Sequence, residues 1–392
     1  MAVKSSHSRL TRWWNRHVAD AFRHVRRQLR RTVSSPGLAL KYQGFRRAVE
    51  RRDWPDAHRR LAPLAVAAEK AGDARLLMEM AFAAERLGEH EKSNEWAAAN
   101  ARLTGVITKT DWQGESLLDA TLVVRFMESE KQGMAIGLNM AGYVAEAAAD
   151  AAHCALIVEK RLVPLFARTL PGVEVLAYPA EADAKPGTRL VTANALTLRT
   201  VLGVAPEKVL RRFLPLQADK AVSAKLRARY RAGRDLPVIG ISWWSSHFGK
   251  DLPDIRVWAE LVRSTEAVFV SLQYGDVAAD EEVLRRAAPD RWIVDETVDQ
   301  LVDMDLFAAQ LGALDAVVTI SNTGAHLAGA MGVPTLLIRD DWFRRAWPVL
   351  SDRTPWYPHT RVHGKDGRSW EEVFQSLRNE LKRVLKTGKA AR

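Results

Sequence analysis

The residues best suited to chemistry lie in a turn that follows a short apolar run late in the chain. The run at 316–320 predicts a buried strand, and the pattern over 325–331 predicts a helix after it. The turn and the first helical positions hold Ser321, Asn322, Thr323, Gly324 and His326. Ligands of an open α/β sheet bind beyond the carboxyl ends of its strands, where a new helix presents unpaired N–H groups and its positive dipole end to an anion. The turn therefore predicts a pyrophosphate site that needs no metal.

The same turn also has a purely structural interpretation. Asn and Thr are frequent helix caps, so Asn322 and Thr323 in this interpretation only begin a core helix. His326 is then a buried histidine with an ordinary hydrogen-bond partner. Spacing alone leaves both interpretations open.

Two series of short apolar strands alternate with helical patterns from residue 117 onward, which is typical of doubly wound parallel sheets. The strands of the first series are expected at 121–125, 155–158, 173–177 and 189–192. A charged helix at 219–234 and a linker at 235–237 follow it. The strands of the second series are expected at 238–242, 267–272, 292–294, 316–320 and 335–338. We therefore expect an α/β fold with two Rossmann-type lobes, at 106–235 and 236–392. Neither has a Gly-x-Gly-x-x-Gly fingerprint or a Walker loop, which argues against hydride transfer and ATP hydrolysis.

Several motifs of the second lobe occur together in a familiar order. They are Gly240–Trp243, Val270–Gly275, Asp303–Ala309, Asn322–Gly332, Asp341–Trp342 and Pro355–Pro358. This set resembles the tetratricopeptide-associated and heptosyltransferase-like GT-B glycosyltransferases, whose turn reads Asp-Thr-x-x-x-His-Leu-Ala-Gly-Ala-x-Gly. Here Asn322 stands in place of the Asp. The resemblance covers 236–375 and is thin before it. It implies a GT-B pair of lobes, with the acceptor side first and the nucleotide-sugar side second.

The resemblance assigns further residues to the donor site. It implies that the turn from Ser321 to His326 embraces the donor diphosphate, and that Lys250 contacts its phosphates, with Arg256 as a second candidate. A cation there stabilises the leaving nucleotide in a water-poor cleft. Gln273 and Asp305 match positions near the nucleoside, although each is equally well explained as a loop or helix-capping residue.

The first lobe departs from the family at the residue that takes the proton of the acceptor. Relatives have a Gln-Gly-x-Gly-Asp loop whose Asp is the proposed general base. Here the loop at 132–139 reads Gln-Gly-Met-Ala-Ile-Gly-Leu-Asn, and Ile136 holds the Asp position. Because Ile cannot accept a proton, Glu128, Glu130 and His247 are the candidate catalytic bases. Each can equally be an ordinary surface residue, so we expect an acceptor lobe that is partly degenerate.

Two helical segments precede the lobes. The pattern at 9–33 predicts one amphipathic helix, and residues 1–36 carry nine Lys or Arg and one Asp, which is +8 of the net charge of +11. A basic helix of this kind suits an anionic membrane surface, and a solvated helix on the next domain or an RNA contact are the alternatives. Residues 37–105 are helical in pattern, and aligning Trp54 with His90 gives a period of 36 that resembles tetratricopeptide hairpins. An unrelated helical cap is the alternative.

Composition sets the remaining limits. The single cysteine, Cys154, excludes an internal disulfide and lies in an apolar stretch, so we expect a buried, unreactive thiol. No apolar run approaches the roughly 18 residues of a membrane span, and no secretory signal is evident. We therefore expect a cytoplasmic protein, peripheral at the inner face of the cytoplasmic membrane. We recognise no Asp-x-Asp motif and no cluster of His and Cys at metal-ligand spacing, so no metal is expected.

The leading hypothesis is a metal-independent glycosyltransferase that moves a sugar from a nucleotide-diphospho-sugar to a glycan, lipid-linked or protein acceptor. The donor is a substrate, so no cofactor is expected, and no DNA partner is expected either. The second hypothesis is a degenerate GT-B module that binds a nucleotide-sugar or glycan without transfer. The third is a tetratricopeptide-like scaffold at the membrane. Donor turnover separates the first from the second, and nucleotide binding separates both from the third.

Overall fold

The structure is a computed structural model of the chain. It describes residues 35–390 with the exception of 52, 88, 105–110, 127–134, 246–250, 341–346, 348, 350 and 351. The basic helix expected at 9–33 lies outside the described residues. The chain divides into two compact units, residues 1–108 and residues 109–392. Among the described helices, none combines the length and the apolar character that a membrane crossing needs.

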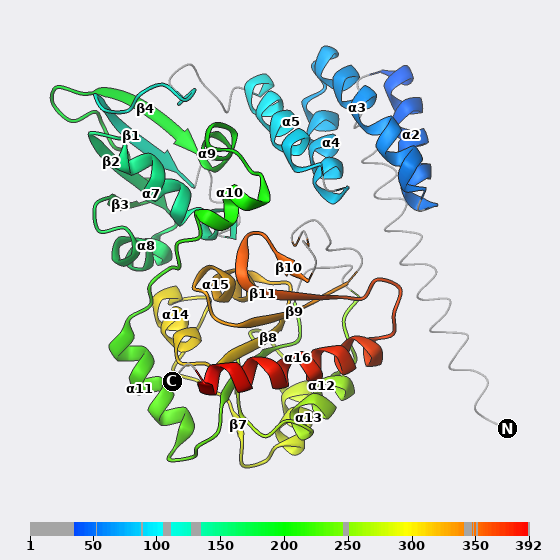
Figure 1. The fold of residues 1–392 in the computed structure, drawn as a ribbon, viewed down its shortest axis with the longest axis vertical. Helices are drawn as coiled ribbons and strands as arrows, with labels where there is room; N and C mark the ends of the chain where they lie inside the picture. The colour runs from blue at the N-terminus through cyan, green and yellow to red at the C-terminus, as the bar shows by residue number, and fades with distance from the viewer. Residues whose placement is uncertain are drawn as a thin grey trace. The chain divides into compact units, whose positions relative to one another are not determined.

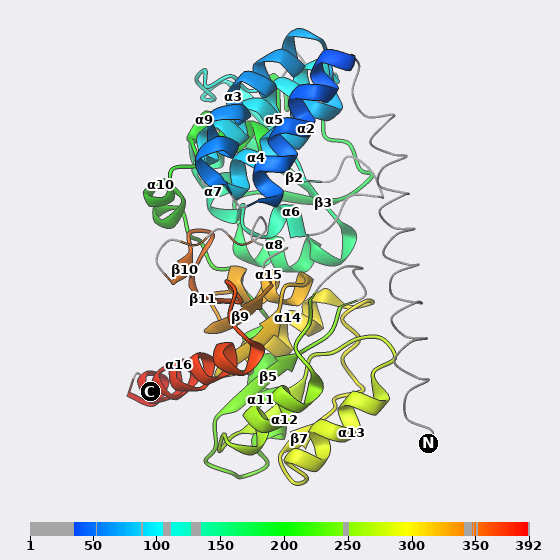
Figure 2. The ribbon, with the colours of Figure 1, turned by 90° about the vertical axis from the view of Figure 1, so that its right-hand side faces the viewer.

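The described part of the first unit consists of four helices that lie side by side (Figures 1 and 2). They are α2 (Pro36–Glu50), α3 (Trp54–Lys70), α4 (Ala74–Arg86) and α5 (His90–Leu103). Ser35 and Asp53 cap α2 and α3 by accepting hydrogen bonds from backbone N–H groups of the first turn. Buried leucines, alanines and Trp96 form a core that belongs to this unit alone. The likeness to tetratricopeptide units stays a prediction.

The first lobe of the second unit is built on a parallel sheet of four strands in the order β3-β2-β1-β4 (Figure 1). Its strands are β1 (Ala120–Arg125), β2 (His153–Val158), β3 (Glu174–Ala177) and β4 (Arg189–Asn194). Its helices are α6 (Ala135–Leu138), α7 (Ala141–Ala149), η1 (Lys160–Leu162), α8 (Val163–Thr169), α9 (Ala195–Leu202) and α10 (Pro206–Arg211). Cys154 is buried in this lobe, and burial raises the pKa of its thiol to about 12, which agrees with the expected unreactive cysteine.

The second lobe is built on a sheet of seven strands in the order β10-β11-β9-β8-β5-β6-β7, parallel except for the pair β10–β11. Its strands are β5 (Val238–Ser242), β6 (Val268–Ser271), β7 (Trp292–Ile293), β8 (Ala316–Ile320), β9 (Thr335–Arg339), β10 (Arg353–Thr354) and β11 (Tyr357–Gly364). Its helices are α12 (Ile255–Arg263), α13 (Ala278–Ala287), α14 (Met304–Gly312), α15 (Thr323–Ala330) and α16 (Trp370–Ala390).

Two layers of helices cover the larger sheet. Trp258 of α12 and Phe374 of α16 pack on one face, against apolar side chains such as Ile239. On the other face, α14 and α15 join a core that continues into the first lobe. Gly240 lies between these layers on β5, where an added Cβ would come within 2.5 Å of Leu272 Cδ1. A larger residue at this point of the strand would require the leucine side chain to shift.

The expected α/β fold with parallel sheets is confirmed, and the observed strands begin and end within about two residues of the expected ones. The sequence analysis missed β10 and β11. The expected charged helix is α11 (Lys220–Arg231), and it packs against α14 of the second lobe although we had placed it with the first.

Candidate functional site

The predicted turn lies at the carboxyl edge of the larger sheet, beyond a central strand. β8 is entirely buried between β9 and β5, and Asn322 directly precedes α15 with an extended backbone (φ −156°, ψ −179°). Ser321 is buried, whereas Asn322, Thr323, Gly324 and His326 are half-buried. The five residues therefore sit together where an open sheet binds its ligands.

Asn322 uses both ends of its amide within the protein. Its Oδ1 accepts a hydrogen bond from the N–H of Ala325 at 2.9 Å, which caps α15. Its Nδ2 donates to the hydroxyl of Ser242, at the end of β5, also at 2.9 Å. One side chain thereby caps the helix and joins the ends of two neighbouring strands.

Gln273 extends this network to the end of β6. Its Oε1 accepts hydrogen bonds from the Ser242 hydroxyl at 3.2 Å and from the N–H groups of Trp243 and Trp244, both at 2.9 Å. Its Nε2 donates to the carbonyls of Trp244 and Tyr274. The structure thus uses the Gln273 amide to hold two turns together, and its contact with a nucleoside stays a prediction.

His326 is held by two buried aromatic residues. Its ring stacks on Trp347 with 4.2 Å between ring centroids, and its Nδ1 lies 3.1 Å from the hydroxyl of Tyr357. Because burial raises the pKa of Tyr357, that hydroxyl keeps its proton and is able to donate to Nδ1. Trp347 is fixed in turn, since its Nε1 donates to Ser321 Oγ at 2.8 Å. His326 therefore has a defined position in the first turn of α15.

Thr323 and Gly324 open α15, and their backbone faces the edge of the sheet. Within the described part of the chain, neither backbone N–H has a hydrogen-bond acceptor, as is usual for the first residues of a helix. A Cβ added at Gly324 would come within 3.3 Å of Asn322 Oδ1 and of the Phe307 ring. A side chain at position 324 would therefore be crowded, and the N–H groups of Thr323 and Gly324 are the two donors that a ligand could use.

Four of the predicted residues lie outside the described part of the chain. They are Glu128, Glu130, His247 and Lys250. Their roles stay predictions. Ile136 belongs to α6, and this short helix lies against α15.

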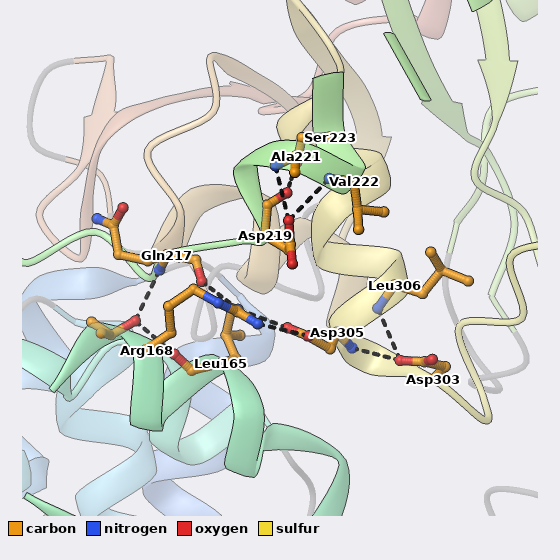
Figure 3. Close-up of polar contacts among 11 residues, drawn as sticks. Leu165, Arg168, Gln217, Asp219, Ala221, Val222, Ser223, Asp303, Asp305 and Leu306 are labelled. Atoms are coloured by element: carbon orange, nitrogen blue, oxygen red, sulfur yellow. Dashed lines mark hydrogen bonds and ion pairs between the residues drawn. The ribbon is translucent and has the colours of Figure 1, made fainter. Parts of the chain in front are cut away.

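Two further candidates have partners that sequence analysis missed. Arg256 is exposed and forms a bidentate ion pair with Asp254, and that hydrogen bond lowers the pKa of Asp254 to about 2. Asp305 forms a bidentate pair with Arg168 of the first lobe (Figure 3). The structure thus places Asp305 at the junction of the lobes.

The sequence analysis overlooked Asp303-Met304-Asp305, which has the spacing of an Asp-x-Asp metal motif. Both carboxylates accept hydrogen bonds from other groups of the protein. Asp303 caps α14 by accepting from the N–H groups of Asp305 and Leu306. Asp305 faces Arg168, as described above. Among the described residues, no group of three or more His, Cys, Asp or Glu side chains is arranged to hold a metal.

The sequence analysis identified the residues of the turn but not the side chains that hold them in place. Tyr357 stands in a motif that carried the family resemblance, yet its hydrogen bond to His326 required the fold. Trp347 had no sequence signal of its own. Ser242 also lies within a matched motif, and its position opposite Asn322 follows only from the pairing of β5 with β8.

Comparison with known proteins gives these findings. No family model matches the sequence. The chain is 28% identical over 286 residues to protein FlbA of Caulobacter vibrioides. The match covers 64% of this chain and 44% of FlbA, so the chain spans less than half the length of that relative. A glycosyl transferase family 9 structure from Veillonella parvula aligns with a TM-score of 0.46 and 10% identity, over 72% of this chain and 100% of that one. The E. coli ADP-heptose lps heptosyltransferase II aligns with a TM-score of 0.44 and 12% identity, over 69% and 99%.

Proposed function

We propose that the chain is a glycosyltransferase that binds a nucleotide-diphospho-sugar at the N-terminus of α15. The observation that carries this proposal is the pair of N–H groups of Thr323 and Gly324 at the carboxyl edge of the sheet, which have no acceptor among the residues that the structure describes. The dipole of α15 adds positive potential there, and each such contact is typically worth about 0.3–1 kcal/mol. The order of motifs shared with GT-B glycosyltransferases supports the same assignment.

In this proposal the turn and Lys250 hold the diphosphate while a base from the first lobe activates the acceptor hydroxyl. In the sequence, Glu128 and Glu130 stand between β1 and α6, and His247 comes after β5. Any of them replaces the Asp that the family has at Ile136. The acceptor is a glycan, a lipid-linked sugar or a protein, and the basic segment 9–33 holds the enzyme at the inner membrane face.

The donor half of this proposal is tested by binding. Adenosine, uridine, guanosine, cytidine and thymidine diphosphates are compared with their nucleosides by thermal shift and calorimetry. A diphosphate at 100 times its Kd should stabilise the fold by about 2.7 kcal/mol. Lys250→Ala should weaken diphosphate binding far more than nucleoside binding, while Arg263→Ala, on an outer helix, should change neither. Equal losses for diphosphate and nucleoside would remove Lys250 from the phosphate site.

The catalytic half is tested by turnover. Release of the nucleoside diphosphate from a bound nucleotide-sugar, with and without acceptor, measures transfer and hydrolysis. One of Glu128→Gln, Glu130→Gln and His247→Gln should lower the rate by about 10²- to 10⁴-fold with little effect on donor binding. Tight donor binding without any turnover would leave a binding module in place of an enzyme.

A further inference from the structure

Two arginines of the first lobe make polar contacts with the second lobe. Nη1 of Arg161 donates to the carbonyl of Leu301 at 2.6 Å, and several contacts are made by Arg168, at the end of α8 (Figure 3). Its Nη1 and Nη2 donate to Oδ1 and Oδ2 of Asp305, both at 2.9 Å, and Asp305 lies in the first turn of α14. Nη1 also donates to the backbone carbonyl of Gln217 at 2.8 Å. One guanidinium thus joins the first lobe, the second lobe and the segment that crosses between them.

The crossing segment, residues 212–219, is fastened to both lobes. Arg212 forms a bidentate pair with Glu146 of α7, and the N–H of Gln217 donates to Thr169 Oγ1 at 2.9 Å. On the other side, the N–H of Leu216 donates to the carbonyl of Ala330, at the end of α15, at 3.0 Å. The connection is therefore held at several points along its length.

The helix after this segment is fixed to the second lobe. Arg227 of α11 donates to the carbonyl of Ala313 at 2.8 Å and to Asp315 Oδ1 at 2.6 Å. Ser223 of α11 lies so close to Gly312 that a Cβ there would be 2.8 Å from its Oγ. Because α11 is attached to the second lobe in this way, rotation between the lobes must take place within 212–219, beside Arg168.

We propose that the Arg168–Asp305 pair is a latch on this hinge. It holds α14 against α8, so that α6 of the first lobe stays over α15, and it must break before the lobes separate. The hydrogen bond to Asp305 raises the pKa of Arg168, so the guanidinium stays charged near neutral pH. Closed lobes would also align the proposed acceptor side with the proposed donor side. This consequence rests on the proposed function, whereas the latch itself does not.

The size of the interaction suits a latch. The side chains of Arg168 and Asp305 keep 32% and 26% of their surface exposed, so solvent weakens the pair. Its bidentate geometry places it at the stronger end of such pairs. We expect its loss to raise the population of open lobes by about three- to tenfold, which biases the hinge without disrupting the fold.

The test measures the distance between the lobes without any nucleotide. Spin labels are attached to Ala184→Cys in the first lobe and Asp290→Cys in the second, both exposed positions, in a chain with Cys154→Ala. Pulsed electron resonance should give one main distance for the full chain. Arg168→Ala and Asp305→Asn should each add a longer-distance population, and the double variant should add no more than either single one. Arg263→Ala, whose partner Glu260 is on the same helix, is the matched control.

Unchanged distance distributions in both single variants would overturn the latch, and so would additive effects in the double variant. Asp305→Asn keeps the size of the side chain, so it remains informative if Arg168→Ala fails to fold, which circular dichroism reports. Because no ligand is present, a failure of nucleotide binding would overturn the proposed function and leave this result standing.

Discussion

In the turn before α15, substitutions of Asn322 can separate an effect on stability from an effect on diphosphate binding. Asn322→Ala removes the cap of α15 and the contact with Ser242, so it should cost about 0.5–2 kcal/mol of stability, measured by denaturant unfolding. Asn322→Asp keeps an oxygen that accepts the hydrogen bond from the N–H of Ala325, and it adds a negative charge beside the proposed phosphate. It should therefore leave stability nearly unchanged but weaken diphosphate binding about tenfold, with nucleoside binding unaffected. Diphosphate binding that is unchanged or improved with Asp would mean that the phosphates lie away from the side chain at position 322.

His363, on β11, predicts a dependence of stability on pH. Its Nε2 is buried and has no hydrogen-bond partner among the described residues, and burial together with Arg368 and Arg361 lowers its pKa to about 4. Between the ordinary pKa of about 6.5 and this value, the unfolded chain binds a proton that the folded chain does not. Stability should therefore fall as the pH drops through that window, by at most about 1.4 kcal/mol per pH unit for this proton.

The measurement is unfolding by denaturant from pH 7 to pH 5, where few carboxylates titrate. His363→Gln should flatten the curve relative to the wild type. His153→Gln, at an exposed position, should leave its slope unchanged. Parallel curves for the wild type and His363→Gln would mean that His363 titrates normally in the folded state.

Among the elements, α15 depends on one glycine for its approach to β11. A Cβ at Gly329 would come within 2.7 Å of the Tyr357 ring and 3.0 Å of Thr360 Oγ1. Gly329→Ala should destabilise the fold by about 1–3 kcal/mol despite the better helix propensity of Ala, because the packed ring must shift. Gly172→Ala, with open space around it, is the control. Since Tyr357 also contacts His326, diphosphate binding should weaken in the first variant only.

The sequence predicted those elements whose pattern is strong. The strands of the parallel sheets are short apolar runs such as β8, and burial on both faces requires that composition. β11 was missed because it carries His359, Arg361 and His363 among few apolar residues, and only part of it is buried. α11 was placed with the wrong lobe because its attachment depends on Arg227 and Asp315, which are far apart in sequence.

In the candidate site too, the sequence predicted the local features but not the long-range contacts. Asn322, Thr323 and His326 were found because turn, cap and helix are local features of the sequence. The hydrogen bonds of Asn322 with Ser242 and of His326 with Tyr357, and the pair between Arg168 and Asp305, join residues more than 30 positions apart. No local sequence pattern contains such contacts, so they could be identified only from the folded structure.

On the scale of the whole molecule, charge is distributed unevenly. Residues 1–36 hold +8 of the net charge of +11, so the remaining chain carries only +3. The division into two compact units separates this basic end, together with the four helices, from the two lobes. Attraction to an anionic surface and binding of a nucleotide are therefore expected to depend on different parts of the chain.

Deletion of residues 1–33 should release the protein from vesicles of anionic lipid and leave nucleotide binding intact. Each basic residue near such a surface contributes about 1 kcal/mol, so even partial engagement of the segment is measurable by co-sedimentation. Binding of the full chain should also decrease with added salt, because the Debye length shortens from about 10 Å at 0.1 M to 3 Å at 1 M. Trp13→Ala with Trp14→Ala, which keeps the charge, tests whether the aromatic rings enter the headgroup region. Neutral vesicles serve as the control lipid, and a truncated chain that still sediments with anionic vesicles would place the anchor elsewhere.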